Sequence, residues 1–328
     1  MLQTNAYAHI VSQPVFSENA KHVLCTLIYF DIFSYPLTAQ EIFERCTLNN
    51  FNQVGEGLEE LLANGTVFFI KDFFCLHNNE SLIEKRLAGN NAADKSLEIA
   101  KRITNIIKRF PYVKGVMLSG SISKNYMDKD SDIDYFIITS TNRLWVSRLF
   151  FVLFQKMVFF NRSKYLCYNY MVDEEHMAIG DKSFYTAIEA STLIPVYNFE
   201  AYNGFCKSNL WIQAYYPNYP MAEDALLDNK QSLTQRVLEK LFNNDFGDWL
   251  DQWLMKKIEA KWRRRYSPNM FAGTKNLHLK RHTAKAHTDG HYNRIMDMYD
   301  KKKKEYEQLY NVQLEIKTHL ITSIKLNA

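Results

Sequence analysis

The spacing of apolar residues predicts that the chain begins with a compact helical unit. Apolar positions repeat near the 3.6-residue period of a helix in three successive segments, and the first segment ends where Pro36 interrupts the pattern. Two short apolar runs follow and are typical of a β-ribbon. The expected elements are a helix capped by Ser17, a helix with a capping box at Thr38 and Glu41, a helix over residues 52–64, and a ribbon over residues 66–76.

Three helices followed by a ribbon resemble a winged-helix module, and we assign this N-terminal module to residues 1–90. Winged helices often bind DNA, and they do so through a basic recognition helix. Here the third helix contains Glu56, Glu59 and Glu60 and no Lys or Arg. Because carboxylates repel phosphate, nucleic acid is not a favoured partner, and a winged-helix regulator that binds nucleic acid stays an alternative.

The pattern changes after Pro111, where apolar runs too short for helices indicate buried strands. A helical stretch over residues 81–110, with a soft break at Gly89, comes before them, and a helix over residues 143–160 lies among them. The expected strands cover residues 113–118, 133–138 and 165–172. We therefore predict an α+β protein with a mixed-sheet core over residues 91–200 and a helical C-terminal region over residues 201–328.

Composition supports a folded protein inside the cell. Of the 328 residues, 47% are hydrophobic and 23% are charged, and the 5 cysteines are scattered without a C-x-x-C pair, so neither a disulfide framework nor a cysteine zinc site is expected. The first 20 residues lack a signal-peptide pattern, and the most apolar run, residues 145–160, is interrupted by Arg148, Gln155 and Lys156. We expect a cytoplasmic location and no membrane partner.

Charge is distributed unevenly along the chain. Residues 256–304 contain 15 Lys/Arg and 4 Asp/Glu, a local charge of +11, whereas the rest of the chain carries −7. An anionic partner is therefore expected for this basic segment. One hypothesis is that Lys280, Arg281, His282 or Lys285 returns to an active site and neutralises a triphosphate. Helical i, i+4 spacing would pair the histidines of this segment on one face, although a solvated helix face is the simpler interpretation: His278, His282, His287 and His291.

One stretch has a pattern that indicates chemistry. Gly120-Ser121 ends a predicted strand, and after ten residues Asp132-x-Asp134 begins the next strand. Side chains two apart on a strand point to the same face, so the two carboxylates would lie together and would require a cation between them. Mg²⁺ suits one or two carboxylates together with substrate phosphates. A Gly-Ser turn beside them allows a phosphate to approach the backbone closely.

This motif, with Ser131 directly before the first aspartate, resembles the signature of the DNA polymerase beta-like nucleotidyltransferase superfamily, of the minimal nucleotidyltransferase type. Asn125 stands where that signature has Gly, and Asn also tolerates a left-handed turn. The resemblance implies that Gly120, Ser121 and Ser131 bind the phosphates of a nucleoside triphosphate. It implies further that Asp132 and Asp134 ligate Mg²⁺ or Mn²⁺.

The resemblance also implies a third catalytic carboxylate on a later strand. On the predicted strand over residues 165–172 the polar residue in the middle is Asn169, and Asp173 follows four residues later on the same face. If Asp173 fills the third position the triad is complete, and we prefer this assignment. If Asn169 fills it, the site binds metal and nucleotide but turns over weakly or not at all.

The predicted function is Mg²⁺-dependent transfer of a nucleoside monophosphate from a nucleoside triphosphate to an acceptor hydroxyl. The acceptor is left open between a small molecule, a protein side chain and an RNA end, as are the choice of nucleotide and the oligomeric state. The first alternative is a catalytically weak, nucleotide-binding regulatory protein with the same fold. The second is the winged-helix regulator.

Overall fold

The computed structural model describes residues 16–160, 164–222, 230–271, 277–286 and 290–315. The N-terminal module has the predicted elements in the predicted order. Ser17 caps the first helix by accepting a hydrogen bond from Ala20 N, and Thr38 and Glu41 form the expected capping box. The winged-helix assignment itself stays a prediction. The elements are α1 (Glu18–Asp31), α2 (Ala39–Arg45), α3 (Phe51–Ala63), and the antiparallel pair β1 (Phe68–Ile70) and β2 (Phe73–Cys75).

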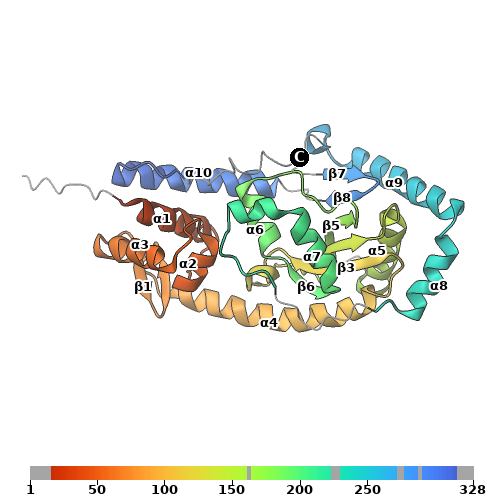
Figure 1. Cartoon of the computed structure of the whole chain (residues 1–328), viewed down its shortest axis with the longest axis horizontal. Coiled ribbons are helices and arrows are strands. Elements are labelled where there is room, and N and C mark those ends of the chain that lie inside the picture. The colour runs from red at the N-terminus through yellow and green to blue at the C-terminus, as the bar shows by residue number, and fades with distance from the viewer. Residues whose placement is uncertain (1–15, 161–163, 223–229, 272–276, 287–289, 316–328) are drawn as a thin grey trace, which may run out of the picture.

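The centre of the molecule is a six-stranded mixed sheet with strand order β6-β3-β4-β5-β8-β7 (Figure 1). Strands β4 and β5 run parallel, and all the other neighbours in this sheet are antiparallel. The strands are β3 (Val113–Ser119), β4 (Asp134–Thr139), β5 (Cys167–Asp173), β6 (Ile194–Tyr197), β7 (Leu277–Lys280) and β8 (Thr283–Ala286). The α+β class and the mixed sheet are confirmed.

The prediction of a helical C-terminal region is incomplete, because β7 and β8 add a hairpin to the sheet beside β5. His278 and His282 therefore lie on this hairpin and not one turn apart on a helix. Each strand has four residues and carries cations among its apolar positions, so the alternating pattern is too short to separate from a polar helix by sequence. Strand β6 was not predicted because it has only four residues and one of them is Pro195.

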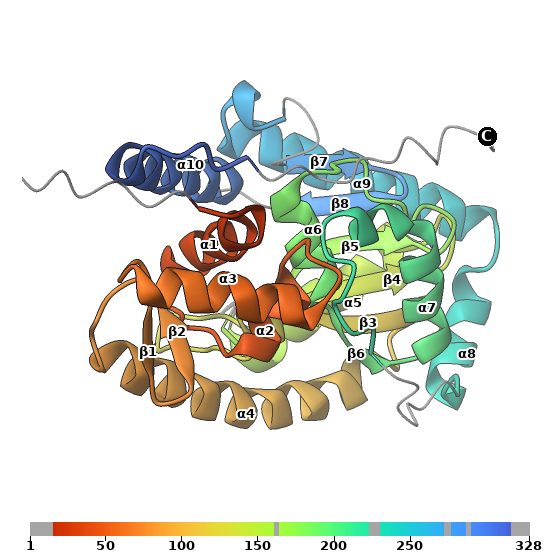
Figure 2. The same cartoon turned by 60° about the vertical axis from the view of Figure 1, so that its left-hand side comes forward.

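Helices cover both faces of the sheet, and further helices lie beyond it at both ends of the molecule (Figures 1 and 2). Side chains of α4, α5 and α9 pack on one face, and side chains of α6 and α7 pack on the other. Helix α10 returns to the N-terminal module and packs on α1. The helices are α4 (Ser81–Ile107), α5 (Leu144–Phe159), α6 (Phe184–Ser191), α7 (Phe199–Ser208), α8 (Leu233–Phe242), α9 (Asp245–Arg265) and α10 (His291–Tyr310), with three short 3₁₀ helices η1 (Ile122–Lys124), η2 (Leu210–Ala214) and η3 (Pro268–Phe271).

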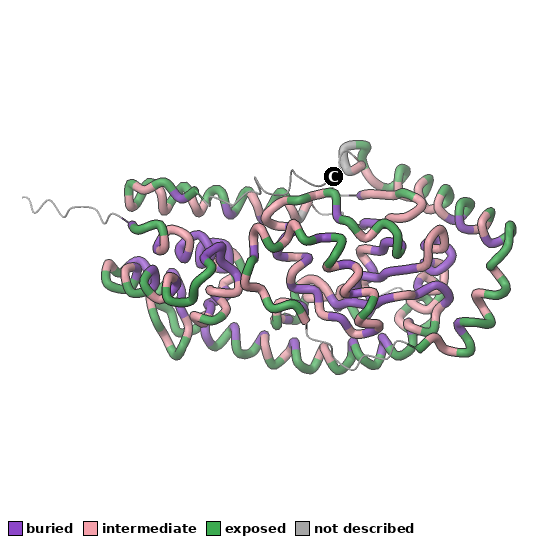
Figure 3. Tube along the Cα trace, in the orientation of Figure 1, coloured by how far each residue is buried: buried purple, intermediate pink, exposed green. Residues whose placement is uncertain are grey.

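Helix α4 is continuous, so the expected break at Gly89 does not occur. It runs from the N-terminal module to the sheet, and buried segments of both lie beside it (Figure 3). Gly89 has a packing role instead: a Cβ at this position would overlap the ring of Tyr126. The absent side chain thus lets the segment after η1 lie directly against α4, where Met127 N donates to Gly89 O at 3.1 Å.

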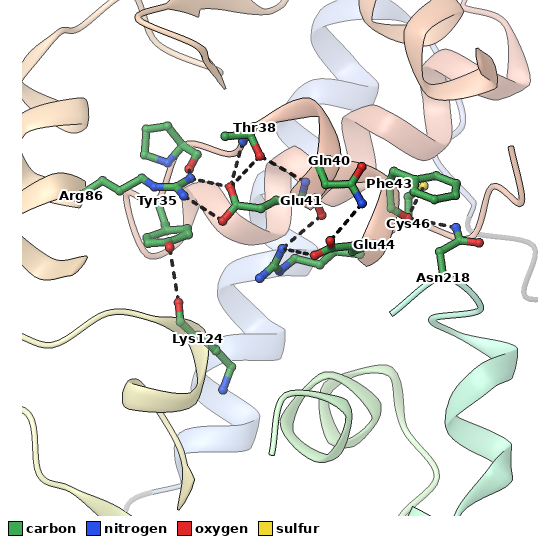
Figure 4. Close-up of polar contacts among 12 residues, drawn as sticks. Tyr35, Thr38, Gln40, Glu41, Phe43, Glu44, Cys46, Arg86, Lys124 and Asn218 are labelled. Carbon is green, nitrogen blue, oxygen red and sulfur yellow. Dashed lines mark hydrogen bonds and ion pairs between the residues drawn. The ribbon is translucent and has the colours of Figure 1, made fainter. Parts of the chain in front are cut away.

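Arg86 joins helix α4, which continues to the sheet, to the other elements of the N-terminal module (Figure 4). Its buried guanidinium makes two hydrogen bonds of 2.7 Å to the carboxylate of Glu41 and a third to Pro36 O. It also stacks on the rings of Tyr35 and Phe73, at 4.4 and 4.3 Å from the centroids. Burial raises the pKa of Glu41, but the hydrogen bonds and charge of Arg86 outweigh it and hold that pKa below its usual value.

Replacing Arg86 should therefore destabilise the protein strongly. Arg86→Ala leaves a buried carboxylate without its partner, so we expect about 3–5 kcal/mol less unfolding free energy in urea denaturation followed by circular dichroism. Arg86→Lys keeps the charge but loses the two-pronged geometry and should lose roughly half of that. Arg102→Ala, on the exposed side of the same helix, is the control and should cost less than about 0.5 kcal/mol. Equal stability of Arg86→Ala and Arg102→Ala would contradict the assignment.

Candidate functional site

A cavity of about 470 Å³ lies where one end of the central sheet meets the N-terminal module. The turn after β3 and the start of β4 form its floor, and β5, β8 and α6 contribute further side chains. Helix α1, the loop that follows it and α10 add aromatic side chains. The charged residues that line it are Asp132, Asp134, Asp181, Glu189, Lys124 and Lys285.

The Gly120-Ser121 turn has the geometry that the motif predicts. Gly120 adopts a left-handed conformation with φ of +70° directly after β3, and both residues line the cavity. A Cβ at Gly120 would also collide with the Asp134 carboxylate, so glycine is required for conformation and for space. Asn125 closes η1 with φ of +55°, which confirms the expected left-handed turn.

The two aspartates of the motif reach the same cavity. Asp134 opens β4, where it lies opposite Ser119 of β3 and Cys167 of β5, and Asp132 lies just before the strand. The intervening Ile133 is buried in the core. Burial, with an added contribution from the charges of Asp132 and Glu189, raises the pKa of Asp134 to about 7. Two carboxylates in a sheltered cavity are thus unfavourable together without a cation.

Asn169, and not the Asp173 that we preferred, lies in the cavity beside Asp134. Asn169 lines the cavity, and its Nδ2 donates to Asp134 Oδ1 at 2.8 Å. Asp173 pairs in register with Thr139 at the far end of β4, which is five residues, or roughly 16 Å, from Asp134. The sequence shows that Asn169 and Asp173 share a face, but it does not show which of them lies opposite the aspartate pair.

Asp173 has a structural role instead. It is completely buried, and its carboxylate accepts hydrogen bonds from Asn142 N, Glu175 N and His176 Nδ1 at 3.3, 3.2 and 2.6 Å. The His176 ring stacks on His282 at 3.8 Å between centroids. Asp173 therefore holds the loop after β5 and the β7–β8 turn together.

The remaining predicted phosphate-binding residues lie away from the cavity lining. Ser131 donates its hydroxyl to Asp128 Oδ1 at 2.7 Å and closes the turn before the aspartates. Lys280 is exposed at the end of β7, and Arg281 forms an ion pair with Asp248 of α9 at 3.1 Å. From the same basic segment, Lys285 of β8 does line the cavity, as one version of the hypothesis expected. His287 lies outside the described residues, and His291 starts α10.

Sequence reasoning missed the basic and acidic side chains that flank the aspartates. Lys124 of η1 forms an ion pair with Glu189 of α6 at 2.9 Å, and its Nζ also donates to Gly120 O at 3.1 Å. The pair therefore holds the turn that carries Gly120 against α6. The sequence gives one hint, since Lys124 lies inside the motif, but the sequence does not show that Glu189 lies beside it.

Sequence reasoning also missed the aromatic wall that the N-terminal module contributes. Four aromatic side chains from α1 and the loop after it line the cavity: Tyr29, Phe30, Phe33 and Tyr35. The buried hydroxyl of Tyr29 has no hydrogen-bond partner within the described part of the chain. Tyr35 donates to the carbonyl of Lys124 at 3.3 Å and so joins this wall to the turn of the motif. The wall provides flat apolar surface beside the charged floor, as a nucleobase or an aromatic acceptor requires.

The donor set suits a hard cation such as Mg²⁺. Asp132 and Asp134 supply carboxylate oxygens, and because burial raises the pKa of Asp134, a cation between them would favour its ionised form. Within the described ranges no group of three or more His, Cys, Asp or Glu is arranged for a metal ion. Two carboxylates are enough when substrate phosphates complete the coordination, which is the usual manner of Mg²⁺ in phosphate chemistry.

Comparison with known proteins agrees with this geometry. Residues 100–187 match the family model described as a nucleotidyltransferase domain, and this range includes Gly120, Ser121, Asp132, Asp134 and Asn169. No curated protein and no solved structure matches the chain. Among the described helices none is both long and apolar enough to span a bilayer. The chain thus carries a nucleotidyltransferase domain at residues 100–187, consistent with the polymerase beta-like type that its motif resembles.

Proposed function

We propose that the protein is a Mg²⁺-dependent enzyme that transfers a nucleoside monophosphate from a nucleoside triphosphate to an acceptor hydroxyl. The observation that supports this proposal is the convergence of Asp132, Asp134 and the Gly120-Ser121 turn on one cavity. Each has a role in nucleotidyl transfer: the carboxylates bind the metal, and the turn binds the phosphates. The matching family supports transfer in general and leaves the acceptor open.

The residues around the cavity have separate roles in the proposed reaction. Gly120 allows the phosphates to approach the backbone, and the hydroxyl of Ser121 donates a hydrogen bond to a phosphate oxygen. Lys285 adds positive charge from β8. Asn169 holds Asp134 in place by its amide. When bound at Asp132 and Asp134, Mg²⁺ would supply charge neutralisation at the phosphates and acidify the acceptor hydroxyl.

A nucleotide-binding protein with weak catalysis is the second candidate, and the position of Asn169 favours it. An amide cannot take a proton from the acceptor, whereas the family resemblance implies a carboxylate at this place. The cavity has two other carboxylates, Asp181 and Glu189. Glu189 is engaged by Lys124, and Asp181 accepts a hydrogen bond from the Thr186 hydroxyl at 2.8 Å.

Label transfer tests the main proposal. The protein is incubated with each of the four α-labelled nucleoside triphosphates, Mg²⁺ or Mn²⁺ and a metabolite extract, and pyrophosphate release is measured in parallel. Asp132→Ala and Asp134→Ala should each lower the rate about a hundredfold or more, because each removes a metal ligand. Asp130→Ala, at an exposed position in the loop between the Gly120-Ser121 turn and Asp132, should leave the rate unchanged. No label transfer above that of Asp132→Ala would refute the enzyme proposal.

Asn169→Asp distinguishes an efficient enzyme from a weak one. If the wild type binds nucleotide in equilibrium dialysis but turns over slowly, the new carboxylate should raise the transfer rate at saturating Mn²⁺ by roughly a hundredfold, the usual contribution of a general base. Asn169→Ala is the control, because it removes the hydrogen bond to Asp134 without adding a base. An unchanged or lower rate in Asn169→Asp would contradict the weak-enzyme candidate and leave Asn169 as a positioning residue.

The burial of Asp134 beside other carboxylates also predicts how stability depends on pH in the absence of metal. Because the folded protein raises the pKa of Asp134 to about 7, this group favours folding below pH 4 and loses that contribution as the pH rises to 7. The asparagine side chain in Asp134→Asn carries no charge at any pH. In EDTA this variant should match the wild type near pH 4 and exceed its unfolding free energy by up to about 4 kcal/mol at pH 8. Asp130→Asn is the control, and an equal pH profile for Asp134→Asn and the wild type would contradict the raised pKa.

A further inference from the structure

Helix α8 leaves a row of apolar side chains exposed and packs inward in part through polar groups. Its inward side carries polar groups: Gln235 Nε2 donates to Val113 O at 2.9 Å, and the Glu239 carboxylate accepts from Tyr112 N at 2.7 Å. Its outward side carries an aliphatic residue at every fourth position. These outward residues and their exposed fractions are Leu233 (74%), Val237 (56%) and Leu241 (60%).

Helix α9 continues this apolar surface with aromatic rings. Its inward side is buried through Gly247, Asp251 and Leu254. On its outward side three large rings stand at helical spacing and stack on one another, with centroids 5.8 and 6.1 Å apart and planes within 28°. The rings and their exposed fractions are Phe246 (55%), Trp249 (56%) and Trp253 (43%). Six large apolar side chains left in water on two consecutive helices indicate a binding surface.

Positive charge adjoins the rings on the same helix. Lys257 lies one turn beyond Trp253, with its Nζ 5.4 Å from the centroid of that ring, and Arg264 continues the outward side. Further exposed cations lie along the C-terminal half of α9: Lys256, Lys261, Arg263 and Arg265. None of these side chains lines the cavity, so the proposed nucleotide site does not explain this half of the basic segment.

The six apolar residues and the cations of α9 are called here the α8–α9 face. It lies at the end of the molecule opposite the N-terminal module (Figure 1), in a part of the chain that has many exposed positions (Figure 3). We propose that the α8–α9 face binds an anionic membrane surface, with the rings and aliphatic side chains in the interfacial layer and the cations on the lipid headgroups. This binding is peripheral, and it departs from the expectation that the protein has no membrane partner.

The chemistry of the face favours lipid over the other anionic or apolar partners. Nucleic-acid bases stack on aromatic rings and gain little from the aliphatic row of α8, whereas acyl chains gain from both. Trp side chains suit the boundary between headgroups and acyl chains. A second copy of the chain would bring the cations of two α9 helices close together. The complementary partner is therefore a surface that is apolar and negatively charged at once.

Vesicle co-sedimentation of the full chain tests this proposal. We expect binding to vesicles that contain phosphatidylglycerol, much weaker binding to phosphatidylcholine alone, and weaker binding as salt rises. Trp249→Ala/Trp253→Ala should weaken binding about tenfold or more. Lys257→Ala/Arg264→Ala should weaken it roughly fivefold per charge and reduce its salt dependence. Leu309→Ala and Lys301→Ala, at exposed sites of α10, are matched controls and should bind like the wild type.

Three outcomes would overturn the proposal. The first is no co-sedimentation of the wild type with the anionic vesicles at low salt. The second is dimerisation in sedimentation equilibrium that the tryptophan variant abolishes, which would assign the face to a second copy. The third is binding of a single-stranded oligonucleotide that the same variants lose while vesicle binding is unchanged. Circular dichroism spectra equal to that of the wild type ensure that each variant is folded. The test needs no nucleotide and no acceptor, so its result is independent of the proposed enzyme activity.

Discussion

The close approach of the Asp134 carboxylate to Gly120 is the contact on which the site depends. It requires a residue without a side chain after β3 and a left-handed turn at the same position, and Gly120 meets both conditions. The antiparallel register that sets Ser119 opposite Asp134 brings the turn and the carboxylate together. Burial of Asp134, together with the charges of Asp132 and Glu189, raises the pKa of that group, so its ionised form is disfavoured unless positive charge lies nearby. The geometry of the turn and the electrostatics of the proposed metal site thus both centre on Asp134.

The same turn is also where the N-terminal module contacts the nucleotidyltransferase domain. Arg86 holds Glu41 and stacks on Tyr35, and the Tyr35 hydroxyl reaches the carbonyl of Lys124 in η1 (Figure 4). Lys124 in turn binds Glu189 on the opposite side of the cavity. The module is therefore part of the site, because it supplies the aromatic wall and supports the turn that carries the motif. A fragment limited to the matched domain would lack both.

The sequence predicted what depends on local spacing and missed what depends on register and distant packing. Capping by Ser17, the left-handed Asn125 and the clustering of Asp132 with Asp134 follow from residues close in the chain. The choice between Asn169 and Asp173 depends on how β5 pairs with β4, which alternation along one strand does not encode. The aromatic wall depends on how α1 and α10 pack against the end of the sheet, and no local pattern in the sequence predicts this packing. The short, polar hairpin β7–β8 was not predicted because its strands are stabilised by pairing with β5 and are not indicated by their own composition.

The cations of the basic segment are close together in the sequence but lie in different places in the folded structure. Of the basic segment, Lys285 reaches the cavity, Arg281 neutralises Asp248, and the cations of α9 point away from the sheet. The cavity itself has four carboxylates against Lys124 and Lys285, and Lys124 is already paired with Glu189. A bare triphosphate would meet net negative charge there and be repelled. In the proposed function, a nucleotide that enters with its divalent cation brings positive charge to Asp132 and Asp134, so we expect this acidic cavity to bind the nucleotide as its metal complex.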